Sequence, residues 1–567
     1  MKITNNKGIA LIYSLFTTVI LISLSTLFVL RTVHEKNIIG VEKNLAQSFH
    51  ASNAGTQAGL DGLDNLINNF LLNTISNSTP SGVISTTLSY VSSDDGIGWL
   101  LYSVRDNNTP VLLENGAQAE YTQTGTIGNL NYTYNIIITE KEDPIAVTST
   151  SWDFSYNYRV ESASTVNNVS KDIVITGDFT VRVQKDNFAK YALFTNAQTL
   201  PNGTNVWFTN KTNFNGPLHT NERFNFAFNP SGIFDGAVIQ SDQSARFYNR
   251  GWPVLLDSNA NGTRDVPIFN TGFTRDEAIV TLTSPSQKQD MIDQASANQT
   301  YLVDGIYTPN DGTTLTGGIY VEGDSSIALS VNGSNQAVYT VNQGGAIKII
   351  TVDDSTQQTT IEDVSAGSTN TYSGMPTGLD NAGTIIFVNG NVTSLQGTVQ
   401  ESTEVTISSN DDITIQNHVL YSDYTSATGS PGDVNYVPPS ADGTSNLLGL
   451  VSWEGDVLIG TSAPDDVNIH GTIMARDGIL QVDSYNNIGA GARGTATLLG
   501  GVITDNYGAF GLFNGRTGVH LSGYGRNFIY DQRMSNGSSP PYFPSLSTFI
   551  AFTNDITDKM TWQEGDN

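Results

Sequence analysis

The sequence IALIYSLFTTVILISLSTLFVL, residues 9–30, decides the architecture of the first part of the chain, because it contains no charged residue. As a helix rising about 1.5 Å per residue it reaches ~33 Å, which is enough to cross a hydrocarbon core of about 30 Å. Residues 31–70 carry charges and space their apolar positions by three or four, so the helical pattern continues. We therefore predict one long helix over residues 9–75, with a membrane-spanning part at 9–30.

A short polar leader, residues 1–8, carries two lysines and ends in Gly8 immediately before the apolar block. No small-residue cleavage site follows the block, which argues against a secretory signal peptide. Lys2 and Lys7 favour a cytoplasmic N-terminus, although basic residues also follow the block. Since a large β-type region follows with no second apolar span, export of that region is the simplest topology.

The glycine-ending leader, the long apolar helix and the small-residue run ASNAG at 51–55 resemble the type IV pilin superfamily. In that family a prepilin peptidase cuts after the glycine, which in this chain places cleavage between Gly8 and Ile9. Tyr13 stands at the fifth mature position, where most major pilins have glutamate. PilX-like minor pilins and GspK-like pseudopilins also lack that acid, and PilX-like proteins carry an A-E-A-G-like run where this chain has ASNAG, without its glutamate. The resemblance implies a single-pass inner-membrane precursor that later packs with other pilin subunits in an extracellular pilus.

Composition narrows the remaining possibilities for the 567-residue chain, which has a formal net charge of −28 and no cysteine. Without cysteine, disulfides, thiol catalysis and cysteine-bound metals are excluded. Without a basic stripe, we expect no nucleic-acid partner. Glycine, asparagine, serine and threonine are abundant, while helix-forming lysine, glutamate and arginine are scarce after residue 70. This composition predicts an α+β chain that is mainly β.

Strand patterns divide the β region into two parts. Residues 85–190 alternate apolar and polar side chains, as in YTYNIII at 132–138, and predict a small antiparallel β domain docked on the upper helix. Residues 191–550 hold short strands between Gly, Asn and Asp corners, which predicts a C-terminal parallel β-solenoid. A β-sandwich is the alternative, because the strand spacing is irregular. Residues 551–567 are expected to form a C-terminal tail.

Three runs in the second part resemble a β-solenoid domain of unassigned function that occurs in some PilX-like proteins. They are GPLHTN at 216–221, NLLGL at 446–450, and YDQRM at 530–534 with PPYFP at 540–544. The resemblance implies a location and an architecture and leaves the activity open.

The best candidate metal site is DSNANGTRD at residues 257–265. Oxygen ligands at positions 1, 3, 5 and 9, glycine at position 6 and a backbone carbonyl at position 7 match the first part of an EF-hand-type calcium loop. Position 12 is Ile268, so Asp276, Glu277 or a distant carboxylate would have to complete the shell. The alternative is an Asx-rich turn without an ion. The candidate calcium ligands are Asp257, Asn259, Asn261, Thr263 and Asp265.

Catalytic motifs are missing from the sequence: it has no G-x-S-x-G, H-E-x-x-H or Walker motif. The G-x-G-x-x-G letters at 489–494 lack the strand-to-helix context of a nucleotide site. The acidic pairs at 411–412 and 465–466 would point to opposite faces if they lay within strands, so we predict polar corners there. The histidines of the β region are expected to be structural. We therefore expect no enzymatic activity.

Together these features predict a PilX-like minor pilin, or a tip or priming subunit, of a type IV pilus or related filament. The large β head is bulky for a repeating lattice, which favours a tip position and use in surface adhesion, with a surface or polysaccharide as ligand. Two alternatives stay open. One is a pseudopilin of a type II secretion system, and the other is a membrane-anchored β-solenoid enzyme acting on polysaccharide.

Overall fold

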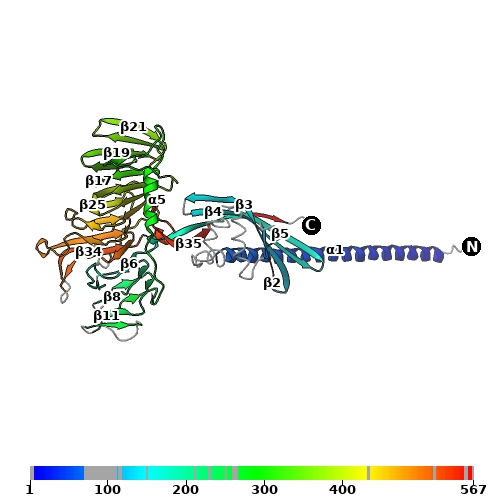
Figure 1. The fold of residues 1–567 in the computed structure, drawn as a ribbon. Helices are drawn as coiled ribbons and strands as arrows, with labels where there is room; N and C mark the ends of the chain where they lie inside the picture. The colour runs from blue at the N-terminus through cyan, green and yellow to red at the C-terminus, as the bar shows by residue number, and fades with distance from the viewer. Residues whose placement is uncertain are drawn as a thin grey trace, which may run out of the picture. The chain divides into compact units, whose positions relative to one another are not determined.

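The computed structural model describes residues 6–68, 111–112, 118–148, 151–209, 212–227, 232–249, 252–257, 266–430, 435–514, 519–553 and 560–564. They form one long helix followed by a chain that is mostly strand, which confirms the predicted mainly β class of α+β fold (Figure 1). The chain divides into two compact units. We call Met1–Gln184 with Thr548–Asn567 the helix unit, and Lys185–Ser547 the stack unit.

Helix α1 (Asn6–Asn65) runs without a break through the predicted membrane span and the charged stretch that follows it. It begins before the predicted start at residue 9, so the end of the leader is already helical, a correction that follows from the absence of any helix-breaking residue but Gly8 there. Within the described part of the chain, α1 is the one helix long and apolar enough to cross a membrane. Residues 69–110, which hold the predicted end of the helix and the start of the predicted antiparallel β domain, lie outside the described residues.

A seven-stranded antiparallel sheet packs on the C-terminal half of α1. β1 to β5 are neighbours in chain order, and the two C-terminal strands β35 and β36 both pair with β5. Within the expected C-terminal tail, residues 551–553 belong to β35 and residues 561–564 form β36, which pairs with backbone groups that the edge of β5 offers. The strands are β1 (Val111–Leu112), β2 (Gln118–Ile127), β3 (Leu130–Thr148), β4 (Ser151–Val166), β5 (Val169–Asn187), β35 (Ser545–Thr553) and β36 (Thr561–Glu564).

Two large sheets build the stack unit, and most of their neighbouring strands are parallel. The first, with eleven strands, is parallel throughout except for β15 against β16. Parallel pairing from coil to coil is what the solenoid prediction expects, whereas a β-sandwich pairs its strands antiparallel. In sheet order the first sheet holds β14 (Phe273–Thr274), β10 (Val238–Gln240), β7 (Leu218–Thr220), β6 (Leu193–Ala197), β32 (Val502–Asn506), β29 (Thr472–Ala475), β26 (Leu447–Ser452), β24 (Glu404–Ser409), β22 (Thr384–Asn389), β16 (Ile319–Glu322) and β15 (Gly305–Tyr307).

The second sheet has thirteen strands and ends in an antiparallel meander, β17 to β21. Gly344 and Gly345 both have positive φ in the two-residue turn of one of its hairpins, which is the geometry that a tight hairpin needs. The strands of this sheet are β17 (Ser325–Val331), β18 (Ala337–Gln343), β19 (Ala346–Asp353), β20 (Gln358–Asp363), β21 (Ser368–Ser373), β23 (Val392–Val399), β25 (Ile413–Tyr421), β27 (Val457–Ile459), β28 (Asn468–His470), β30 (Leu480–Val482), β31 (Ala492–Leu499), β33 (Gly511–Phe513) and β34 (His520–Ile529).

The strand order shows that the chain builds the stack in two runs. β6, β7, β10 and β14 proceed in one direction, and the chain then re-enters at the opposite end with β16 and returns to pair β32 with β6. Figure 1 shows this order, with β34 beside the β6 region and β17 to β21 far from it. Pairing β32 with β6 covers the edge that each run would otherwise expose.

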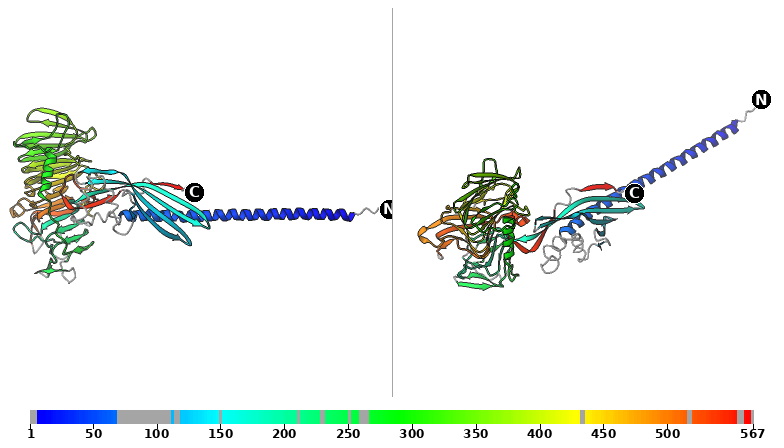
Figure 2. Two further views of the ribbon diagram at one scale, coloured as in Figure 1. Left: turned by 45° about the vertical axis from the view of Figure 1, so that its right-hand side comes forward. Right: turned by 45° about the horizontal axis from the view of Figure 1, so that its top comes forward.

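Helix α5 (Pro285–Ser296) makes the return between the two runs and lies along the stack (Figures 1 and 2). Ser284 caps its N-terminus, and Met291 and Ala295 are buried. Lys288 forms an ion pair of 2.6 Å with Glu454, and Gln294 accepts a hydrogen bond of 2.6 Å from the backbone of Leu379. The helix therefore fastens several successive coils. Small additional sheets hold β8 (Asn225–Phe226), β11 (Ala245–Asn249) and β12 (Trp252–Leu256), and β9 (Ile233–Phe234) with β13 (Ile268–Phe269).

A ladder of directly paired aliphatic side chains forms the spine of the core and passes through both runs. Every member is at most 3% exposed, and burial of each such side chain contributes about 1.5–3 kcal/mol. The ladder makes the two runs one hydrophobic body. Its members, in order, are Ile319, Ile386, Ile407, Leu450, Ile473, Val502, Leu193, Leu218 and Val238.

Candidate functional site

The first functional feature is the apolar segment of α1, residues 9–30, whose large side chains are exposed; Leu11 and Phe28, for example, are 70% and 67% exposed. Four of its hydroxyl side chains, those of Ser14, Thr17, Thr18 and Thr26, donate hydrogen bonds to carbonyls of the same helix. Thr17 donates to the carbonyl of Tyr13 at 2.6 Å, and Thr26 donates to that of Ile22 at 2.8 Å. Both the backbone and these side chains are thus ready for a medium without water.

The small-residue run at 51–55 meets the protein's own sheet. Ser48 and Ser52 donate hydrogen bonds of 2.5 Å to the backbone carbonyls of Ser164 and Ser162 on β4. A Cβ added to Gly55 would lie 2.1 Å from the Ser162 hydroxyl, so the helix approaches the strand as closely as only glycine permits. The glycines serve close packing inside the helix unit. In Figure 2 the other half of α1 lies apart from the strands of this sheet.

The predicted processing residues lie near the start of α1. Gly8 is exposed with open space around it among the described residues, and Ile9 is 57% exposed. Both are accessible from solution in the isolated chain. Cleavage between them stays a prediction.

The predicted calcium ligands fall almost entirely outside the described residues. Only Asp257 is described, directly after β12, while residues 258–265 are not. Burial lowers the pKa of the Arg275 guanidinium, and the charge of Asp257 opposes that shift. Among the residues that the structure describes, no three His, Asp or Glu side chains gather as a metal site. Calcium binding stays a prediction.

One member of the first acidic pair, Asp412, belongs to a structural ladder of side chains at successive corners of the stack. In four consecutive steps a side-chain oxygen accepts a hydrogen bond from a backbone N–H of the next coil, at 2.8, 3.1, 2.8 and 3.0 Å. Asp412 occupies one step, so its carboxylate fixes the spacing of coils. We call this set the corner ladder: Asp324, Asn391, Asp412 and Asp456, with Ile479 as the last donor.

The second acidic pair is likewise part of a corner. Asp466, with a φ of 56°, accepts a hydrogen bond of 2.8 Å from the backbone of Thr495. Asp465 forms an ion pair of 2.9 Å with Arg493. Each carboxylate thus has a partner within the fold, as predicted for polar corners.

Three of the four histidines in the stack unit have structural hydrogen bonds. Nδ1 of His470 accepts from the backbone of Tyr421 at 3.1 Å, and Nδ1 of His418 accepts from the backbone of Asn468 at 3.0 Å. His219 shares a hydrogen bond of 2.9 Å with Asn221. Burial lowers the pKa of His470 to about 3, helped by His418 and Arg533. These hydrogen bonds give the three histidines structural roles in the stack unit.

The runs that resemble the PilX-associated solenoid domain are brought together in space. Arg533 donates a hydrogen bond of 2.7 Å to the carbonyl of Asn446, joining the YDQRM and NLLGL runs. A Cβ on Gly216 would lie 2.4 Å from the ring of Tyr530, and one on Gly449 would lie 2.9 Å from Phe543. The runs therefore contact one another in the fold, although they lie far apart in the sequence.

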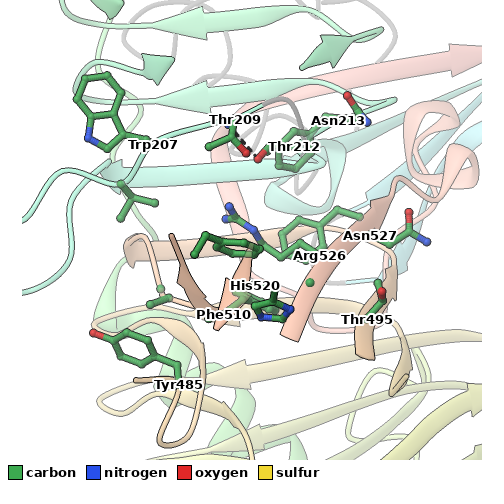
Figure 3. Close-up of a pocket in the computed structure, with 18 of the residues that line it drawn as sticks. Trp207, Thr209, Thr212, Asn213, Tyr485, Thr495, Phe510, His520, Arg526 and Asn527 are labelled. Carbon is green, nitrogen blue, oxygen red and sulfur yellow. Dashed lines mark hydrogen bonds between the residues drawn. The ribbon is translucent and has the colours of Figure 1, made fainter. Parts of the chain in front are cut away.

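A cavity of about 1220 Å³ is the second functional feature, and sequence reasoning missed it. Trp207, Thr209, Thr212 and Asn213, from the segment between β6 and β7, lie on one side of it (Figure 3). Residues of the loops and strands around β33 and β34 lie on the other side, among them Tyr485, Phe510 and Arg526. No motif announced it, since its walls come from distant parts of the chain.

Hydrogen bonds fix several polar groups of the cavity wall. Asn527 donates to the hydroxyl of Tyr436 at 2.6 Å, and Arg526 donates to the hydroxyl of Tyr507. His520 stacks on Phe513 with ring centroids 4.6 Å apart, and burial lowers its pKa, so the ring is neutral near pH 7. The wall is thus pre-organised, with rings and amide groups in defined positions.

Comparison with known proteins gives limited similarity. A domain family of unknown function, DUF4900, matches residues 153–242, a stretch that holds most of β4 and β5 and the first strands of the stack unit. No curated protein matches the chain. Among solved structures, the competence-associated pilin ComZ from Thermus thermophilus is similar with a TM-score of 0.32 at 10% sequence identity, over 92% of this chain and 98% of that chain.

Proposed function

We propose that this protein is a minor pilin-like subunit of a type IV pilus or related filament. Helix α1 would hold the precursor in the inner membrane and, after cleavage by a prepilin peptidase, pack among the helices of other pilin subunits. The observation that carries the proposal is the division of α1 into an exposed, uncharged segment and a half that is covered by its own sheet.

The apolar segment, residues 9–30, exposes large apolar side chains at a cost in free energy. Each large apolar side chain left in water forgoes about 1.5–3 kcal/mol, so the segment needs a covering medium. Lipid provides one, and neighbouring helices provide another. Because the hydroxyls of Ser14, Thr17, Thr18 and Thr26 are already bonded to carbonyls of the helix, they keep these partners on transfer between the two media.

Two features favour a PilX-like tip or priming role over a major subunit. Tyr13 replaces the fifth-position acid of major pilins, and the stack unit adds a body much larger than the sheet of the helix unit. A body of that size is hard to repeat in a closely packed lattice. At a tip, the stack unit would be free to contact surfaces, which supports a role in adhesion.

The enzyme alternative is less favoured, because Asp412, Asp465 and Asp466 each have a hydrogen-bond or ion-pair partner within the fold. The pseudopilin alternative shares the same helix. Deletion of the gene separates it from the pilus subunit: pili should be lost or reduced while type II secretion continues. Lost secretion with intact pili would support the pseudopilin.

Mass spectrometry of the natively expressed protein tests the proposal. The wild-type chain should begin at Ile9, and Gly8→Val should leave the N-terminus at Met1 and keep the protein out of purified filaments. Gly40→Val is the matched control, because Gly40 also lies on α1 with open space around it among the described residues. A wild-type N-terminus at Met1, with the protein missing from filament preparations, would overturn the proposal.

A further inference from the structure

We propose that the cavity lined by Trp207, Tyr485 and Asn527 binds an uncharged oligosaccharide. The inference deepens the proposed function, on which its biological setting rests, because it names the chemical class of ligand that the exported stack unit would meet. Three features support this ligand class: the origin of the cavity, the chemistry of its walls and the scarcity of charged residues in the described part of those walls.

The cavity exists because the two large sheets end differently where the two runs of the stack meet. The first sheet is continuous there, since β32 pairs with β6. The second sheet stops at β34 and β33. The segment between β6 and β7 faces this end and forms the opposite wall. The space is therefore built by the strand order and framed by paired strands.

Both aromatic rings and amide or hydroxyl groups line the walls. Trp207, Tyr436, Tyr485 and Phe513 are each partly exposed, so ring faces are available for the apolar faces of sugar rings. Asparagines and threonines between them supply donors and acceptors for sugar hydroxyls: Asn202, Asn205, Asn213, Asn527, Thr204 and Thr495.

Charged residues are scarce among the described residues that line the cavity, although the chain has 54 acidic and 26 basic residues. Among the described residues that line it, Asp235 and Arg526 are the charged groups. Asp235 accepts a hydrogen bond of 2.6 Å from Asn270, and Arg526 lies over the ring of Tyr507 at 5.3 Å. A single, already engaged cation is a poor receptor for phosphates or uronates, and the many amides make the site too polar for a lipid chain.

Size decides between a single sugar and a chain. At about 1220 Å³ the cavity exceeds the ~300–1,000 Å³ that is usual for small-ligand sites. We therefore expect affinity to rise from a disaccharide to a hexasaccharide of the same sugar.

Isothermal titration of the purified full-length protein in a zwitterionic, sugar-free detergent tests the inference. The probes are cellohexaose, maltohexaose and chitohexaose, with hexagalacturonate as the charged comparison. At least one neutral hexasaccharide should bind, more tightly than its own disaccharide and than hexagalacturonate. Trp207→Ala should weaken that binding by about tenfold or more, because a stacking ring is lost.

Matched variants separate a lost contact from a lost fold. Trp252→Ala removes a tryptophan that is 76% exposed on β12 outside the cavity, and it should leave binding unchanged. Tyr485→Ala is a second wall variant, and its melting temperature checks folding. The inference is overturned if none of the three neutral hexasaccharides binds, if hexagalacturonate binds more tightly, or if folded Trp207→Ala and Tyr485→Ala bind like wild type.

Failure here and failure of the proposed function give different results. A protein that is cleaved at Gly8 and found in filaments, but does not bind the neutral probes, loses only the inference. A protein that binds them but keeps Met1 and never enters filaments retains the site and loses the pilin role.

Discussion

The apolar segment of α1 exposes its apolar side chains, whereas the stack unit buries most of its own in a core. In the segment, apolar side chains point outward and hydroxyls bond to carbonyls of the same helix. In the stack, the aliphatic ladder points inward and backbone groups at the corners bond from coil to coil. The difference shows which region is complete by itself. The stack needs no partner to bury its core, whereas the segment is finished only by lipid or by another molecule.

The same substitution at two leucines tests this contrast most strongly. Leu450→Ala, at the centre of the aliphatic ladder, should destabilise the stack unit by about 2–5 kcal/mol, because it leaves a cavity in a closed core. Leu21→Ala, on the exposed segment, should leave the unfolding of the stack unit unchanged. Thermal and denaturant unfolding in detergent measure both. Equal losses would mean that the segment contributes to the folded core.

A second pair of substitutions sharpens the comparison within α1. A side chain at Gly59 would meet Cγ1 of Val160 at 2.4 Å, so Gly59→Leu should cost about 1–3 kcal/mol through overpacking against the sheet. Gly40→Leu lies where the helix has open space among the described residues and should cost little. Limited proteolysis of the helix unit reports the difference. Equal resistance of both variants would contradict the close docking of α1.

The corner ladder predicts a smaller effect that depends on what replaces a carboxylate. Asp456→Ala should cost about 1 kcal/mol by leaving the N–H of Ile479 without its acceptor. Burial, together with Asp412, raises the pKa of Asp456, so its ionisation opposes folding as the pH rises above the ordinary carboxyl range. Asp456→Asn keeps the acceptor, as Asn391 does two steps earlier in the ladder, and should be as stable as wild type or more so at pH 7. An Asn variant as unstable as the Ala variant would show that the charge itself is needed.

His470 gives the stack unit a pH dependence that the exposed segment lacks. Burial lowers its pKa from 6.5 to about 3, so between these two pH values the unfolded chain binds a proton at His470 and the folded chain does not. The contribution of neutral His470 to the free energy of unfolding should therefore be complete above pH 6.5, and it should be lost as the pH falls toward 3. His470→Gln should flatten this decline in unfolding measured between pH 7 and 4. His34→Gln on exposed α1 is the control and should retain the wild-type slope.

Calcium tests whether the stack is as self-sufficient as described, and we expect its effect to be the smallest. If the loop at 257–265 binds the ion, calcium should raise the melting temperature of wild type, and chelation should reverse the gain. Asp257→Ala and Asp265→Ala should abolish the response. No heat on titrating calcium into wild type would favour the ion-free turn.

Features that depend on local pattern could be predicted from the sequence. The long helix follows from residues 9–30, and the acidic pairs were expected at corners because adjacent side chains on a strand diverge. Which strand pairs with which could not be predicted, because alternation marks a strand without naming its partner. The two opposed runs, the strand at Thr561–Glu564 and the cavity all depend on such distant pairing. Trp207 and Phe513 both line the cavity, but most of the stack unit separates them in the sequence, and no local sequence pattern links them.

The pairing of β32 with β6 means that the stack unit can be completed only after residues 502–506 have been synthesised. The first run can form soon after it leaves the ribosome or the translocation channel, but the edge of β6 stays open until residues 502–506 arrive. An unpaired parallel edge invites association with other chains. A chaperone, or rapid delivery of the rest of the chain, would therefore help this protein most during that interval, and truncation before β32 should leave a product prone to aggregate.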